Sequence, residues 1–265
     1  MSVLKMLQPR AGLRVLVTGG GSGIGLVIAQ AFAETGARVH VCDASQQALD
    51  ALRADPGNEA ISATLADVSD KTAVVRVFAD VQDKLGGLDV LLNNAGIAGP
   101  TGGIDEINAE QWEQTVAINL NAQFYFARLA VPLLKKSPDG GAIIAMASVA
   151  GRLGYAFRTP YSATKFALTG LTQSLAIELG PSNIRVNAIQ PGVVRGPRME
   201  RVIAARAQQL GLSYAEMEAK YLEKISLRRM TTQEEVAATV LFLCSPGGSG
   251  ISGQSISVCG NVEVL

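Results

Sequence analysis

Short runs of apolar, often β-branched residues alternate with longer stretches of helical periodicity, and this alternation limits the fold more than any other feature of the chain. It is typical of βαβ units, which build a parallel sheet. The runs are almost wholly apolar, so both faces of the sheet must be covered. The expected strands are residues 14–18, 38–42, 60–65, 90–92, 142–147, 185–189 and 254–258.

The α/β pattern continues without a linker rich in Pro, Gly or Ser, which predicts one doubly wound Rossmann-type domain over residues 1–265, with about seven parallel strands flanked by helices. The pattern changes only between residues 192 and 228. A charged, helix-favouring stretch, 199–224, has no strand beside it, so we expect a helical substrate lid near 194–226. A helix over 233–244 then leads to the last strand.

Composition and charge exclude several functional classes. Lys and Arg number 23, as do Asp and Glu, so no net field attracts nucleic acid or an anionic membrane. The three cysteines, Cys42, Cys244 and Cys259, are far apart, and the single histidine, His40, cannot complete a metal cluster with them. We therefore expect no metal, buried thiols in a reducing compartment and, since no apolar run is long enough to span a membrane, a cytoplasmic protein.

A glycine-rich turn, residues 18–25, joins the first strand to a helix. Glycines permit tight turns and close approach of a pyrophosphate, and the helix N-terminus favours negative charge. Such a turn also occurs without any ligand, but its place in the first βα crossover favours a dinucleotide site. The predicted phosphate contacts are Gly19, Gly21, Ser22, Gly23, Ile24 and Gly25.

An acid, Asp43, ends the second strand at the distance typical of a ribose-binding residue. Its carboxylate can accept both ribose hydroxyls and would repel a 2′-phosphate, which predicts NAD rather than NADP; the absence of Lys or Arg at Ser22 points the same way. Alternatively, Asp43 caps the helix that begins near Ser45. After the third strand, Asp67 and Val68 are candidate adenine contacts, although Asp67 could equally cap the helix that begins near Asp70.

Tyr161 and Lys165 are four positions apart in a predicted helix, so both side chains lie on one face. An ammonium beside a phenol stabilises the phenolate, which lets Tyr161 act as a general acid or base. A Y-x-x-x-K pair alone is often a surface accident. Here Ser148 ends the fifth strand, Asn93 to Gly96 end the fourth and Asn119 lies in the helix between them, all at the catalytic edge of an open parallel sheet.

With these motifs the chain resembles the short-chain dehydrogenase/reductase family over residues 12 to 260. The resemblance implies a secondary alcohol and its ketone as substrates, with Tyr161 as the proton donor and acceptor and Lys165 as its partner on the nicotinamide ribose. It also implies that Ser148 binds the substrate oxygen and that Asn119 holds a water of a proton relay. The resemblance implies further cofactor contacts, and within the motif Asn93 to Gly96 it favours Asn93. These contacts are Asn93, Ala95, Gly96, Pro191, Gly192 and Val194.

Two positions depart from the family pattern. Gly196 stands where relatives usually carry a threonine whose hydroxyl helps to fix the cofactor, so one hydrogen bond is lost on the lid side. Cys259 stands where an acid commonly precedes Gly260, and we interpret it as a packing change rather than a redox group.

Arginines near the predicted pocket raise the question of an anionic substrate. Arg152, Arg158, Arg195 and Arg198 fall in or beside the substrate segments, where a carboxylate or phosphate could bind. The simpler expectation is that they are solvated or paired with acids of the lid, for example Glu200, Glu216 and Glu218.

The helix over 166–179 carries more apolar residues than one sheet face needs: Leu168, Leu171, Leu175 and Leu179 recur at helical spacing. In the family that the chain resembles this helix pairs with its copy, which implies a homotetramer.

Two alternative functions remain open. A 3-oxoacyl thioester reductase is disfavoured because such reductases usually draw on NADPH. A non-catalytic dinucleotide sensor is disfavoured because Ser148, Tyr161 and Lys165 are all present.

Overall fold

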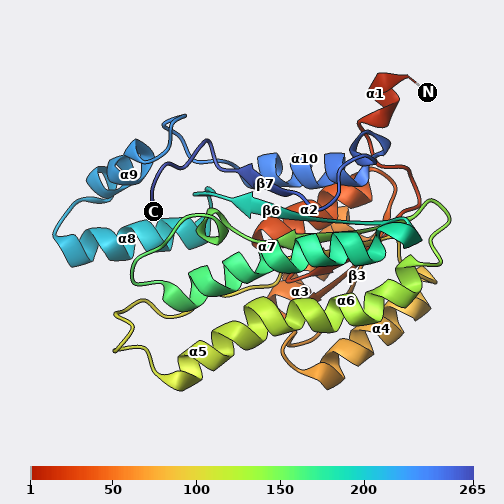
Figure 1. Cartoon of the computed structure of the whole chain (residues 1–265), viewed down its shortest axis with the longest axis horizontal. Helices are drawn as coiled ribbons and strands as arrows, with labels where there is room; N and C mark the ends of the chain where they lie inside the picture. The colour runs from red at the N-terminus through yellow and green to blue at the C-terminus, as the bar shows by residue number, and fades with distance from the viewer. Residues whose placement is uncertain (1) are drawn as a thin grey trace.

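Seven parallel strands form one sheet in the order β3-β2-β1-β4-β5-β6-β7 (Figure 1). The computed structural model of the chain describes residues 2–265, and at positions 205 and 209 only the main chain. The strands are β1 (Arg14–Thr18), β2 (Arg38–Asp43), β3 (Ile61–Leu65), β4 (Val90–Asn93), β5 (Gly141–Met146), β6 (Ile184–Pro191) and β7 (Ser255–Val258). The helices are α1 (Val3–Met6), α2 (Gly23–Glu34), α3 (Gln46–Ala54), α4 (Lys71–Leu85), α5 (Ala109–Val116), α6 (Ala122–Leu134), α7 (Thr159–Leu179), α8 (Pro197–Leu210), α9 (Tyr214–Glu223) and α10 (Gln233–Cys244).

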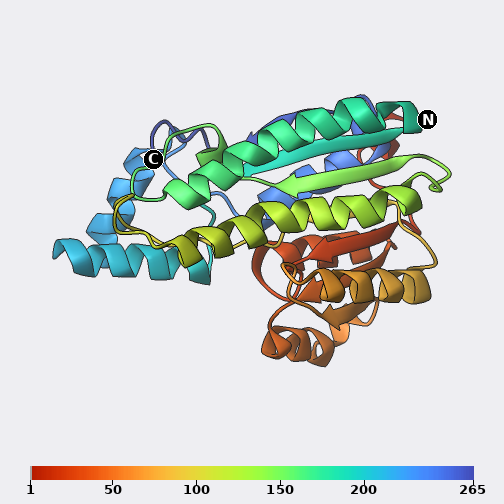
Figure 2. The ribbon, with the colours of Figure 1, turned by 60° about the horizontal axis from the view of Figure 1, so that its bottom comes forward.

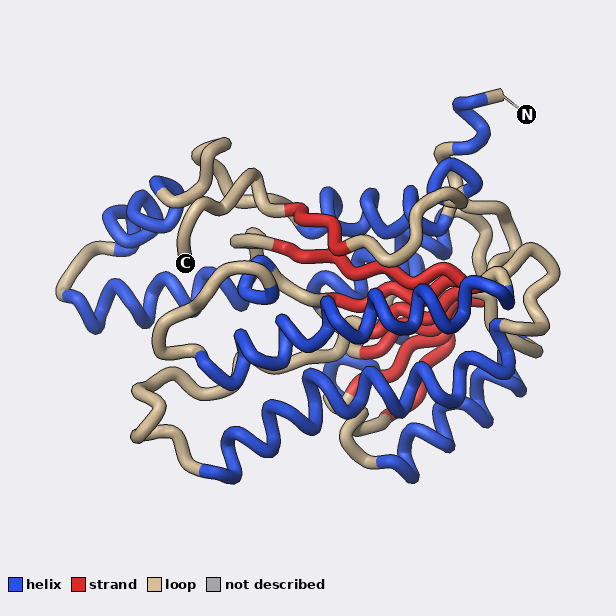
Figure 3. Tube along the Cα trace, viewed as in Figure 1, coloured by secondary structure: helices blue, strands red, loops and turns tan. Residues whose placement is uncertain are grey.

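Helices cover both faces of the sheet, as the apolar strands require (Figures 2 and 3). In β1, Val15 and Val17 pack with α2, α3 and α10, whereas Leu16 packs with α4 and α6 on the other face. Successive strand residues point to opposite faces, so an unbroken apolar run builds two cores at once.

The strand order reverses between β1 and β4, and the loops that follow these strands lie at the same edge of the sheet. At this edge lie also the first turns of α5 and α7 and, beyond them, the α8–α9 pair (Figure 1). Ligands of open parallel sheets bind at such a switch point, outside the carboxyl ends of the strands.

The sequence predicted this architecture. All seven expected strands form, with ends within two residues of the prediction, and α10 has the predicted bounds. The excursion expected near 194–226 folds into α8 and α9. Cys42 and Cys259 are buried free thiols, but the prediction was wrong for Cys244, which is only partly buried. Among the described residues, no helix is long and apolar enough to cross a membrane.

Candidate active site

The glycine-rich turn leads into α2 in a form that suits an anion. Gly19 and Gly23 have φ values of 62° and 57°, in the left-handed region that favours glycine. At Gly25 a Cβ atom would lie 2.2 Å from the carbonyl oxygen of Gly19, so only glycine fits there. Ser22 makes no side-chain cap and the first turn of α2 has no acidic side chain, so its N–H groups face no competing anion from that turn.

A clamp of Thr18 and Asn94 fixes this turn against the next strand of the sheet. Asn94 Nδ2 donates to the carbonyl oxygens of Thr18 (3.0 Å) and Gly19 (2.9 Å), and Thr18 Oγ1 accepts from the backbone N–H groups of Asn94 and Ala95, both at 3.0 Å. The sequence analysis did not assign this clamping role to either side chain. It could have been predicted from the polar residue at the end of each of two strands that become neighbours in the sheet.

Asp43 lies beside the turn, as a ribose-binding acid should. Its Oδ2 accepts from the backbone N–H of Gly21 and its Oδ1 from that of Ser45, both at 3.0 Å. The alternative role as helix cap is wrong, because the cap of α3 is Ser45, whose side chain accepts from Ala48 N. Each carboxylate oxygen keeps a lone pair for a further donor.

Asp67 and Val68 follow β3 at the same edge. Asp67 is exposed and accepts from the backbone N–H and the hydroxyl of Ser69, while Asp70 caps α4, so the alternative capping role of Asp67 is also wrong. The side chain of Val68 is buried in the core, which leaves only its main chain for a cofactor.

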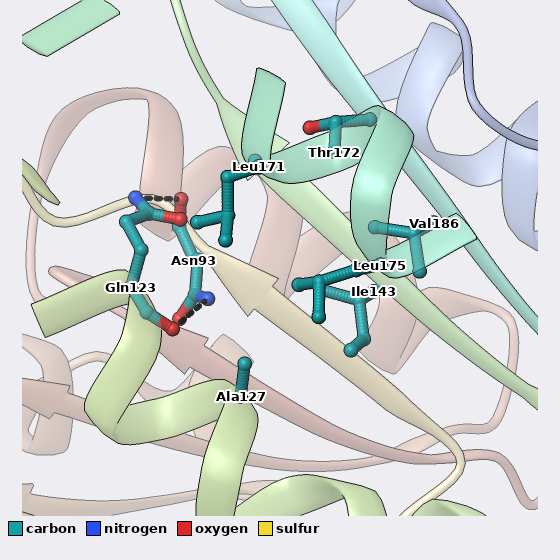
Figure 4. A pocket seen from close by; sticks show the side chains of 9 residues that line it. Asn93, Gln123, Ala127, Ile143, Leu171, Thr172, Leu175 and Val186 are labelled. Atoms are coloured by element: carbon teal, nitrogen blue, oxygen red, sulfur yellow. Dashed lines mark hydrogen bonds between the residues drawn. The ribbon is translucent and has the colours of Figure 1, made fainter. Parts of the chain in front are cut away.

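Asn93 does not lie where we expected it. Its side chain is buried and faces α6, where Asn93 Nδ2 donates to the Gln123 carbonyl (3.3 Å) and Gln123 Nε2 donates to the Asn93 carbonyl (3.2 Å; Figure 4). The two side-chain oxygens, together with the hydroxyl of Thr172, are buried without a partner among the described residues and line a small cavity of ≈ 10 Å³. We therefore correct the assignment: Asn93 packs beneath the site, and Ala95 and Gly96 remain as candidate contacts.

Tyr161 and Lys165 lie in the first turns of α7, and the lysine ammonium is buried. Lys165 Nζ donates to the carbonyl oxygen of Met146 at the end of β5 (2.7 Å) and lies 5.6 Å from the centre of the Tyr161 ring. Burial lowers the pKa of Lys165 to about 7, and the positive charge of Arg198 acts in the same direction. The lysine can thus exchange a proton near neutral pH.

Ser148 follows β5 and precedes a short helical turn, residues 149–151, that packs against α7. Its Oγ accepts from the backbone N–H of Ala150 (3.2 Å), which leaves the hydroxyl proton to be donated elsewhere. Ser162 Oγ donates to the carbonyl oxygen of Ala150 (2.8 Å), so the segment after β5 is tied to the helix that carries Tyr161.

Asn119 lies in a π-helical turn, Ala117–Asn121, between α5 and α6. Its Oδ1 accepts from Ile97 N (2.8 Å), and its Nδ2 donates to Ile97 O (3.0 Å) and to Thr164 Oγ1 (3.3 Å). A Cβ atom at Gly96 would lie 3.2 Å from this Oδ1 and 3.5 Å from Lys165 Nζ, so glycine lets the loop approach both groups. Both Nδ2 hydrogens and one Oδ1 lone pair of Asn119 join loop and helix, so a relay water could use only the remaining Oδ1 lone pair or the main chain.

The segment from Pro191 to Val194 leaves the sheet just before α8. The bonds from Thr231 N to Val193 O (3.0 Å) and from Arg195 N to Thr231 O (2.8 Å) leave the N–H and C=O of Val194 on the opposite side, available to a carboxamide. Gly196 has a φ of 149°, and a Cβ there would lie 2.6 Å from Gln233 Nε2, which itself donates to Arg195 O. Gln233 thus occupies the space in which a threonine at 196 would need to fit.

Known proteins resemble this chain along almost its whole length. Residues 19–261 match a family model described as enoyl-(acyl carrier protein) reductase. The galactitol 2-dehydrogenase of Agrobacterium fabrum is 37% identical over 251 residues, covering 92% of this chain and 95% of that enzyme. The 3-oxoacyl-(acyl-carrier-protein) reductase of Thermotoga maritima is 34% identical over 253 residues, covering 94% and 97%. The crystal structure of an NAD+-bound xylitol dehydrogenase superposes with a TM-score of 0.87, at 28% identity, over 95% of this chain and 99% of that one.

Proposed function

The chain belongs to the short-chain dehydrogenase/reductase family, and its relatives include a galactitol 2-dehydrogenase and a 3-oxoacyl reductase. We propose that it interconverts a secondary alcohol and a ketone with NAD as cofactor. The observation that carries this proposal is the buried ammonium of Lys165, bonded to Met146 O and 5.6 Å from the ring of Tyr161. A structural lysine would have a carboxylate partner, and no ion pair among the described residues includes this one.

Ser148, Tyr161 and Lys165 each have a separate role in moving the proton of the substrate hydroxyl. Ser148 donates its free hydroxyl proton to the substrate oxygen and so stabilises the negative charge that develops there. Tyr161 gives this oxygen a proton during reduction and removes it during oxidation. Lys165 stabilises the phenolate and passes the proton on, and the main chain of the π-helical turn at Asn119 would hold the relay water.

The cofactor site fits a dinucleotide. The N-terminus of α2 would hold the pyrophosphate, Asp43 the adenosine ribose, Lys165 the nicotinamide ribose and Val194 the carboxamide. A bound nicotinamide dinucleotide supplies the hydride acceptor or donor. The fixed charge of Asp43 favours NAD, because a 2′-phosphate would lie against a carboxylate.

Catalysis is tested by substituting Tyr161. We expect Tyr161→Phe to lower kcat by about a hundredfold or more with every accepted alcohol, because the proton-transfer group is lost, and to leave NAD binding intact. A panel of secondary alcohols, ketones and a 3-oxoacyl thioester, offered with each cofactor, identifies the accepted substrates. Tyr125→Phe, on α6, is the matched control and should keep wild-type turnover. Unchanged kcat in Tyr161→Phe refutes the mechanism.

Cofactor choice is tested at Asp43. We expect Asp43→Ala to shift the ratio of NADP to NAD affinity by about tenfold or more towards NADP, since charge-assisted hydrogen bonds to ribose and the repulsion of phosphate both disappear. Asp67→Ala removes a nearby exposed acid and should leave this ratio unchanged. Equal shifts in both variants would contradict the role of Asp43.

We also infer a homotetramer in the cytoplasm. The leucines expected to form its interface serve the chain's own core instead: Leu168 and Leu179 are buried, and Leu171 and Leu175 pack against buried clusters. Other apolar side chains are exposed, namely Phe124 on α6 and Phe166 and Ile177 on α7. Light scattering should give a tetramer for the wild type and smaller species for Phe166→Asp; a monomeric wild type refutes this inference.

A further inference from the structure

Arg158 lies directly beside the proton-transfer group. It precedes the first residue of α7, three positions before Tyr161, and its side chain turns back over the start of the helix. The guanidinium carbon is 5.3 Å from the centre of the Tyr161 ring and 5.4 Å from that of Tyr155. A positive charge is thus held next to the place where the substrate oxygen must meet Tyr161.

The surrounding loops fix this side chain. Arg158 Nη2 donates to the carbonyl oxygen of Ala98 (2.8 Å), and Gly102 N donates to the carbonyl oxygen of Phe157 (3.0 Å). Phe157 has a φ of 62°, which is strained for a bulky residue and persists only where contacts impose it. Two hydrogen bonds therefore hold the loop after β4 against the segment before α7, and the guanidinium is preorganised between them.

In the part of the chain that the structure describes, no carboxylate lies within ion-pair distance of this arginine. Among the described residues, no ion pair includes Arg152, Arg158, Arg195 or Arg198. The expected pairing with lid acids is therefore absent there, whereas the solvated alternative holds for the exposed Arg152, Arg195 and Arg198; Arg158 alone is half-buried. Glu216 instead forms a capping box with Ser213. Arg158 Nε is buried without a hydrogen-bond partner, and of the five N–H donors of an arginine only the one on Ala98 has an assigned acceptor.

Other cations add to the same field. Lys165 lies on α7 with its ammonium 5.6 Å from the Tyr161 ring, and Arg198, in the first turn of α8, acts electrostatically on Lys165. Among the described residues none of these three cations has a carboxylate within ion-pair distance, which favours an anion beside Tyr161, since charge-assisted hydrogen bonds to arginine are the strong ones.

We propose that Arg158 binds an acidic group of the substrate, a carboxylate or a phosphate, and that the natural substrate is an anionic secondary alcohol or its ketone. This proposal rests on the proposed oxidoreductase function and extends it to the substrate class. Arg198, exposed in the first turn of α8, would add its positive charge to the same field.

Substrate pairs in which only one member carries an anionic group test the proposal. The pairs are 3-hydroxybutyrate with its methyl ester, for a carboxylate, and glycerol 3-phosphate with glycerol, for a phosphate. We expect wild type to prefer the charged member of one pair by about tenfold or more in kcat/KM. Arg158→Gln should lower the ratio of kcat/KM for the charged member to kcat/KM for the neutral member by about tenfold to a hundredfold, mainly through the KM of the charged member. Arg158→Lys should restore part of the loss.

Two further measurements make every outcome decisive. Calorimetric titration of the ketones acetoacetate or dihydroxyacetone phosphate into the NAD complex reports anion binding without turnover, because neither can be oxidised by NAD at the carbonyl; failure of both anions to bind overturns the proposal. Arg76→Gln, an exposed arginine on α4, is the control and should match wild type. If Arg158→Gln weakens NAD itself as much as the anion, the arginine serves the cofactor and the proposal is wrong. Turnover of neutral members alone, abolished by Tyr161→Phe, overturns the anion site but leaves the oxidoreductase function standing.

Discussion

Lys165→Met should change how the stability of the cofactor-free protein depends on pH. The ordinary pKa of a lysine is 10.5, and burial lowers that of Lys165 to about 7. Between these values the unfolded chain binds a proton that the folded protein does not, so the free energy of unfolding rises with pH. Below about pH 7 both states are protonated and the contribution of Lys165 is constant. Methionine has a similar length and no charge, so the variant lacks this rise.

The expected magnitude follows from the two pKa values. One proton contributes up to about 1.4 kcal/mol per pH unit to the free energy of unfolding. Between about pH 7 and about pH 9, Lys165 should therefore raise the free energy of unfolding of the wild type by roughly 2 kcal/mol. Other titrating groups contribute equally to both proteins and cancel in the difference between them.

Urea unfolding followed by far-UV circular dichroism, at equal protein concentration and at both pH values, measures this difference. Lys136→Met, an exposed lysine after α6, is the control and should follow the wild type. The free energy of unfolding should rise more between the two pH values in the wild type than in Lys165→Met. A difference between the two rises of less than about 0.5 kcal/mol would refute the reasoning, because the ammonium would then be hydrated or compensated in the folded protein.

Three further substitutions test other parts of the structure. Thr172→Val removes a buried hydroxyl without a partner, so urea unfolding should show unchanged stability or a gain of up to about 1 kcal/mol; a clear loss would reveal a partner in the adjacent cavity. Gly196→Thr should lower stability by about 1–3 kcal/mol and weaken NAD binding in titrations, because of the φ of 149° and the contact with Gln233; tighter binding would contradict this. Asp89→Asn should cost about 2 kcal/mol in urea unfolding, since the buried Asp89 bonds Arg14 Nη2 at 2.7 Å; a cost near zero would show that this pair adds nothing.

The amino-acid sequence alone determined the sheet and the catalytic pair. Strand periodicity and the glycine-rich turn are local properties, so the strands, α10 and the turn before α2 follow from residues close together in the chain. The separation of Tyr161 and Lys165 by four residues puts them on one face of any helix. The residue pattern by itself therefore located the candidate site at the edge of the sheet.

Only the tertiary structure decided which way individual side chains point. Asn93 and Asn94 are neighbours in sequence, but a strand sends adjacent side chains to opposite sides, and only the packing of α6 shows that Asn93 faces Gln123 while Asn94 holds the glycine-rich turn. The same applies to the long side chain of Arg158, whose place over Tyr161 depends on a bond to Ala98, 60 residues away in the chain. Periodicity carries no information about such contacts, because they form between elements that meet only when the sheet is assembled.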